Sequence, residues 1–256
     1  MWPGTYPAGG LHAATTFLRS RAQRESLEST RRFPGSEEAD ETGATRDHGH
    51  EHYDYWRYAG RSWQWYEPML SRMHPVPPVL DLGAGLGLFL ECCRHHGTPA
   101  VGLELSKEGV QAAAAKRLSI VRGDLGLPFP FRDDSFGSAF AHHVLEHVPL
   151  EKERLILKEV RRVLRPGGFI YVVSPNVHQP DARNDPDHIN LFAPRELAAE
   201  ARRAGYSHVD LGTNFWRQFW EPPLHLGKFG NLISGALWKM APIDRFAGSA
   251  SVIAWK

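Results

Sequence analysis

The chain has few of the features that mark secreted, membrane-spanning or nucleic-acid-binding proteins. Of its 256 residues only two are cysteines, and because Cys92 and Cys93 are adjacent they cannot join distant parts of a fold. We therefore expect a reduced compartment, with the cytoplasm as the default. No run approaches about 18 apolar residues, so we expect a soluble protein without a spanning helix. A formal net charge of +1 argues against nucleic acid as the partner.

Composition divides the chain into three parts. Residues 1–50 are rich in Gly, Pro, Ser, Thr and charges, which favours a disordered tail; a transit peptide is disfavoured because Glu25 and Glu28 interrupt the Arg-rich start. Residues 51–75 are aromatic and helix-compatible, and we expect either a lid with Arg61 reaching inward or a helix packed on the core. Residues 76–256 form the expected globular domain.

A second aromatic segment interrupts this domain at residues 214–248, where rings alternate with prolines and sparse lysines. Three roles suit such a composition. The segment walls an apolar substrate pocket, forms a homodimer contact, or lies on a membrane surface through residues 214–240. The sequence leaves these three alternatives open.

The most informative stretch runs from Val79 to Leu90, where an apolar strand enters a glycine turn and then a helix. Glycines at alternate positions, Gly83, Gly85 and Gly87, allow a tight turn and a close approach of backbone to a ligand. The helix that follows, from Leu86 to about Gly97, aims its amides at that ligand. This pattern predicts a nucleotide-like cofactor.

Two acids follow later strands. Glu104 ends a buried run that starts at Ala100, the position that holds a ribose diol in doubly wound folds. Asp124 ends the next short apolar run, where its carboxylate is placed to accept a hydrogen bond from an adenine amino group. A further strand, 135–143, ends in His142 and His143.

In these motifs the chain resembles the class I S-adenosylmethionine-dependent methyltransferases, in particular the small-molecule branch that includes the ubiquinone-biosynthesis O-methyltransferases. The likeness covers roughly residues 76–212. It is carried by the glycine turn from Asp81, by Glu104, by Gly123-Asp124 with Leu-Pro-Phe after it, by Leu145-Glu146-His147, by the Leu-Arg-Pro-Gly-Gly segment 164–168, and by His188 with the segment 192–197.

The resemblance implies S-adenosylmethionine as cofactor and assigns residues to it. Gly83, Ala84 and Gly85 hold the methionine part, and Asp81 meets its ammonium group. Glu104 holds the ribose, and Asp124 with Leu125 frames the adenine. Leu105 and His142 complete the expected cofactor site.

Apolar runs and turn signals predict an α/β fold, with a seven-stranded, mostly parallel, doubly wound (Rossmann-like) sheet and helices on both faces. The resemblance supplies an antiparallel last strand. Further helices are expected at 107–117, 150–164 and from Pro194 to about Ala204, and further strands at 169–174, 206–212 and 249–255.

Methyl transfer to a hydroxyl benefits from a general base, and histidine titrates near neutral pH. His147 and His188 are the candidates; we expect Asp185 or Asp187 to orient His188. In each case the alternative is a residue that only orders its loop. His48, His50 and His52 alternate in the tail and receive no function.

A metal ion is a further alternative, because some similar O-methyltransferases carry Glu-x-x-Glu-His here and use a divalent metal. In this chain His143 replaces the first Glu, which weakens a magnesium site and shifts preference toward softer ions. The candidate ligands are His143, Glu146 and His147. The same letters match an inverted zinc-protease motif, but the run begins on a strand, which disfavours that function.

Together these features predict an enzyme that transfers a methyl group to an oxygen, or less favourably a nitrogen or carbon, of a small, partly apolar metabolite. The alternative is a catalytically silent, cofactor-binding partner subunit. A nicotinamide oxidoreductase is disfavoured because the glycine spacing, Gly83-x-Gly85-x-Gly87, departs from G-x-G-x-x-G.

Overall fold

The structure, a computed structural model, describes residues 61–212, 236–238, 240 and 243–256. The expected tail at 1–50, the start of the aromatic segment at 51–60 and most of the insertion at 214–248 lie outside the described residues. The hypotheses on lid, pocket wall, dimer and membrane contact that depend on those segments therefore stay predictions.

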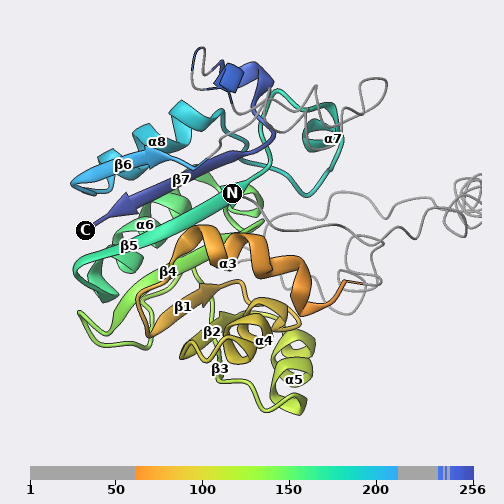
Figure 1. Ribbon diagram of the computed structural model, residues 1–256, viewed down its shortest axis with the longest axis vertical. Coiled ribbons are helices and arrows are strands. Elements are labelled where there is room, and N and C mark those ends of the chain that lie inside the picture. Colours follow the sequence, from red (N-terminus) through yellow and green to blue (C-terminus); the bar gives the residue numbers. More distant parts are fainter. Residues whose placement is uncertain (1–60, 213–235, 239, 241–242) are drawn as a thin grey trace, which may run out of the picture. The chain divides into compact units, whose positions relative to one another are not determined.

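A seven-stranded sheet in the order β3-β2-β1-β4-β5-β7-β6 organises the described residues (Figure 1). Its first five strands are parallel to one another, and β7 runs antiparallel to both β5 and β6. This confirms the expected α/β fold with an antiparallel last strand. The strands are β1 (Val79–Leu82), β2 (Ala100–Glu104), β3 (Ile120–Arg122), β4 (Phe136–His142), β5 (Leu164–Ser174), β6 (His208–Leu211) and β7 (Ala250–Trp255).

Helices pack on both faces of this sheet. On one face, α6 and α8 bury apolar residues against alternate positions of the central strands, such as Leu80 and Ile170. On the other face of the sheet, α3 and α4 pack against the intervening positions of the same strands, such as Val79 and Phe140. The helical elements are η1 (Trp63–Tyr66), α3 (Glu67–Met73), α4 (Leu88–His95), α5 (Lys107–Ala115), η2 (Leu145–His147), α6 (Leu150–Val163), α7 (Pro180–Arg183), α8 (Pro194–Arg203) and η4 (Asp244–Phe246).

Several boundaries differ from expectation, and two of these differences have a clear physical reason. α4 begins at Leu88 rather than at residue 86, because Gly87 has a φ of +75° and lies outside helical geometry. β5 begins at Leu164 rather than at residue 169, because Leu164 pairs with Phe136 across an irregularity in the β4–β5 register. The start of such a strand depends on pairing with a strand distant in the sequence, which the local pattern of apolar residues does not indicate.

Both cysteines lie buried in α4 as free thiols, so they form no disulfide. Burial raises the pKa of Cys92 to about 11. In the described part of the chain, every helix is too short or too polar to cross a membrane.

Candidate active site

The glycine turn connects β1 to α4 in left-handed backbone. Gly83, Gly85 and Gly87 have φ values of +62°, +53° and +75°, a region that disfavours side chains with a Cβ. At Gly83 space is also lacking, since a Cβ there would lie 2.7 Å from Cγ2 of Val144. The turn is therefore held against the segment that follows β4.

Glu104 at the end of β2 reaches across to this turn. Its buried carboxylate accepts a hydrogen bond of 2.7 Å from the backbone N–H of Gly85 through Oε2 and one of 2.8 Å from that of Ser106 through Oε1. Each carboxylate oxygen can accept more than one hydrogen bond, so Glu104 still suits a ribose diol. Two predicted cofactor residues thus meet, although they lie 19 positions apart.

Asp81 lies beside them with an unsatisfied atom. Its side chain is buried, and Oδ2 has no hydrogen-bond partner in the described part of the chain. Burial, and then the neighbouring Glu104, raise the pKa of Asp81 well above its ordinary value. A buried carboxyl oxygen of this kind costs free energy until a donor reaches it. The ammonium group of S-adenosylmethionine is such a donor, so the residues present fit this cofactor.

The remaining predicted cofactor residues lie around the same edge. Asp124, after β3, accepts a 2.7 Å hydrogen bond from the backbone N–H of Gly126, which orders the turn there. Ala84 and Leu125 are buried, and Leu105 is partly buried. The Asp124 side chain therefore stabilises its own turn through this hydrogen bond.

His142 ends β4 within a group of aromatic rings. Its ring makes edge contacts with Trp65 and Tyr66 of η1, at centroid distances of 5.1 and 5.5 Å. Burial, then the nearby His143 and Arg61, lower its pKa well below the ordinary value, so the ring is neutral at pH 7. Arg61 stacks over Trp65 at 4.3 Å. The aromatic segment thus does reach the carboxyl edge of the sheet.

Glu146, in η2, is the centre of a second group. The ring Nδ1 of His143 lies 2.9 Å from Oε1, and the hydroxyl of Ser174 donates to Oε2 at 3.0 Å. Burial opposes ionisation of Glu146, but this hydrogen bond and the neighbouring His143 and His147 hold its pKa below the ordinary value. Glu146 is therefore a buried carboxylate, and its partner Ser174 was not anticipated from the sequence.

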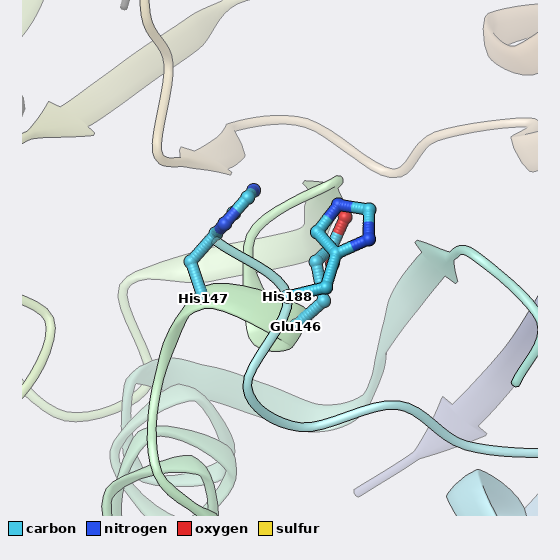
Figure 2. A group of neighbouring side chains, drawn as sticks. All are labelled: Glu146, His147 and His188. Carbon is cyan, nitrogen blue, oxygen red and sulfur yellow. The ribbon is translucent and has the colours of Figure 1, made fainter. Parts of the chain in front are cut away.

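The loop that carries His188 is tied to η2 through the backbone. The N–H groups of Ile189 and Asn190 donate to the carbonyl oxygen of Glu146 at 2.9 and 3.1 Å. These bonds bring His188 beside His147, with ring centroids 5.2 Å apart. Figure 2 shows the side chains of Glu146, His147 and His188 extending in the same direction from the two segments.

Backbone carbonyls hold both rings. Nδ1 of His147 lies 3.0 Å from the carbonyl oxygen of Asp187, and Nδ1 of His188 lies 2.8 Å from that of Ala182. The Asp185 carboxylate lies 3.7 Å from Nε2 of His188, at ion-pair range only. The residue that orients His188 through a hydrogen bond is thus Ala182, where the sequence suggested an aspartate.

Val144 joins the two groups in space. It contacts the glycine turn at Gly83 and lies in the chain between His143 and Glu146. The predicted cofactor residues and the candidate bases therefore share one edge of the sheet, where the carboxyl ends of β1, β2, β4 and β5 meet.

Comparison with known proteins gives concordant results. Residues 80–172 match a family model described as a methyltransferase domain. A demethylmenaquinone methyltransferase of Mycobacterium bovis is 33% identical over 118 residues, 46% of each chain, so this chain spans about half the length of the curated relatives it matches.

Two solved structures share the fold. A SAM-dependent methyltransferase from Archaeoglobus fulgidus superposes with a TM-score of 0.56 at 21% identity, covering 76% of this chain and 95% of the other. A chain from the complex between the Haloferax volcanii Trm112 methyltransferase activator and a methyltransferase gives 0.54 at 22% identity, covering 83% and 99%.

Proposed function

We propose that this chain, a class I S-adenosylmethionine-dependent methyltransferase of the small-molecule branch, transfers a methyl group to an oxygen of a small, partly apolar metabolite. One observation carries the proposal. The glycine turn packs against Val144, so the expected cofactor residues lie at the same edge of the sheet as a carboxylate and two histidines whose ring orientation is set by backbone carbonyls.

In the proposed complex, Asp81 accepts the ammonium group of the cofactor and Glu104 its ribose hydroxyls. Gly83, Ala84 and Gly85 approach the methionine part. Asp124 and Leu125 frame the adenine. The bound cofactor supplies an electrophilic methyl group, so the protein has to align the acceptor and exclude water.

His147 and His188 are the proposed bases. A carbonyl oxygen can only accept, so the Nδ1 that faces it carries the proton and Nε2 carries the lone pair. His147 is partly exposed, whereas the His188 side chain is only 1% exposed. A substrate hydroxyl therefore reaches His147 first in this conformation, with His188 behind it.

The acceptor is tested directly. The full chain is incubated with methyl-labelled S-adenosylmethionine and either fractionated metabolites or defined acceptors, namely a catechol, a demethylmenaquinone suggested by the name of the relatives, and a small amine. Mass spectrometry then identifies the labelled atom. An O-methyl product supports the proposal; a product methylated only on carbon or nitrogen overturns the acceptor assignment.

The alternative is a catalytically silent partner subunit of the same fold. A chain that binds S-adenosylmethionine but forms no methylated product, alone or with host extract, would favour it over the enzyme. We place either activity in the cytoplasm, in keeping with the two free, buried cysteines.

A further inference from the structure

We infer that Glu146, His147 and His188 form a binding site for one divalent transition-metal ion of the zinc class. The inference competes with the proposed base role, because a bound ion would take the Nε2 lone pairs of His147 and His188 that would otherwise accept a proton. Its test is separate from methyl transfer, because it measures binding of an ion to the chain in the absence of any methyl donor. It differs from the ligand set expected from the sequence, in which His143 took the place of His188.

Convergence is the first argument. One ligand atom from each of the three residues lies within 4.8 Å of the other two, although His188 comes from a loop about 40 positions further along the chain. The loop is fixed in this place by the two backbone hydrogen bonds to the carbonyl of Glu146. To bind one ion, the three atoms have to move closer together until each lies about 2.0–2.2 Å from it.

The tautomer of both rings is the second argument. Since each Nδ1 donates to a backbone carbonyl, each Nε2 presents a lone pair. Metal-binding histidines commonly have this arrangement, in which an outer hydrogen bond orients the ring and raises its basicity.

A buried atom without a partner is the third argument. Nε2 of His188 has no hydrogen-bond partner in the described residues, and its side chain is almost fully buried. An unsatisfied buried acceptor is destabilising. A cation between Nε2 and the carboxylate of Glu146 would give this nitrogen a partner.

His143 contacts Glu146 but is not one of the three proposed ligands. Its Nδ1 faces Oε1 of Glu146, and Ser174 donates to Oε2, so both groups orient the carboxylate. The resulting set of two imidazoles and one carboxylate matches zinc and its neighbours better than magnesium, which prefers oxygen ligands. A three-ligand set also leaves a coordination position for water or substrate.

The test uses Co²⁺ and Zn²⁺ with the full chain after chelator treatment, without S-adenosylmethionine. We expect one ion per chain by elemental analysis, with Co²⁺ giving visible absorption bands typical of four- or five-coordinate cobalt. His188→Asn and His147→Asn retain a donor near the Nδ1 position and remove Nε2, and each should weaken binding at least 10-fold. His147 is partly exposed, so its variant keeps the test valid should the His188 variant fail to fold.

Two controls separate this site from other histidines. His208→Asn removes an exposed ring that contacts Asp210 and should leave binding unchanged. Replacing His48, His50 and His52 together by Asn tests whether these alternating histidines bind the ion instead of the proposed site. The inference is overturned by absence of stoichiometric binding, or by binding that survives both His147→Asn and His188→Asn and is lost in the triple variant.

Discussion

The backbone N–H of Gly85 donates a hydrogen bond of 2.7 Å to Oε2 of Glu104. This bond joins the glycine turn after β1 to the end of β2, so one carboxylate both closes the turn and lies where the resemblance puts the ribose. The order of the turn and the binding of the cofactor should therefore depend on the same side chain.

Glu104→Ala should weaken binding of S-adenosylmethionine by about 10- to 100-fold, since hydrogen bonds to a charged group each contribute about 1.5–3 kcal/mol. Isothermal titration calorimetry measures the change. Glu151→Ala, which removes an exposed carboxylate from the start of α6, is the control and should bind normally. Equal affinity of the two variants would remove Glu104 from the cofactor site.

Asp81→Asn should separate binding from stability. The pKa of Asp81 is raised by burial and by Glu104, so its charged form is disfavoured in the protein without cofactor. The neutral amide should therefore leave the free energy of unfolding of the apoprotein at pH 8 unchanged or increased, while affinity for S-adenosylmethionine falls. A variant that loses stability and retains affinity would contradict the proposed contact with the ammonium group.

Gly83→Ala and Gly97→Ala form a matched pair. Both positions have left-handed φ values, +62° and +66°, so both substitutions cost about 1–2 kcal/mol of backbone strain. At Gly83 the added Cβ also meets Val144 at 2.7 Å, whereas at Gly97 no atom lies within 4 Å. Urea unfolding should show a further loss of about 1–3 kcal/mol at Gly83 only, and calorimetry should show weaker cofactor binding there only.

His147→Ala should lower kcat by about 10²- to 10⁴-fold if His147 is the base, with the Kd for S-adenosylmethionine unchanged. His188→Ala should lower kcat as well, because the centroid of the His188 ring lies 5.2 Å from that of His147. Steady-state rates across a pH series, with His208→Ala as the exposed control, provide the measurement. If both variants retain full rates at every pH, neither histidine is the base.

Glu153→Gln should remove a pH dependence of stability. Glu153 in α6 is buried, and burial raises its pKa from 4.5 to about 7, although Asn190 donates a hydrogen bond to it. The folded chain therefore binds this proton more tightly than the unfolded chain, and the free energy of unfolding falls as the pH rises from 4.5 through 7.

Across that interval, the difference in unfolding free energy between Glu153→Gln and wild type should change by on the order of 3 kcal/mol in favour of the variant. Urea unfolding at a series of pH values measures it. Glu151→Gln, an exposed position on the same helix, should follow wild type throughout. A Glu153→Gln profile parallel to wild type would show that the carboxyl ionises normally in the folded chain.

Much of the fold could be predicted because its determinants are local. Apolar runs ending in Glu104 and His142 mark buried strands, and glycines at 83, 85 and 87 mark a turn that side chains with a Cβ disfavour. Because the first five strands are parallel, their carboxyl ends lie at one edge of the sheet, and right-handed crossovers place the helices on its faces. The positions of Asp81 and Glu104 at that edge follow from the same reasoning.

The partners of the site residues could not be predicted in this way. Ser174 donates to Glu146, and the carbonyls of Ala182 and Asp187 orient His188 and His147, but none of these atoms has a distinctive sequence signal. A backbone carbonyl is present in every residue, so only its position in space makes it a partner. The same holds for Leu164, whose pairing with Phe136 extends β5.

The sequence by itself thus determined the fold class, the glycine turn and the identity of the acids at the strand ends, because periodicity, turn chemistry and topology rules act over short distances or on whole elements. Only the tertiary structure decided that His188 lies beside Glu146 and His147, with one ligand atom of each residue within 4.8 Å of the others. That arrangement depends on backbone hydrogen bonds between η2 and a loop about 40 residues away, which form only when the chain is packed.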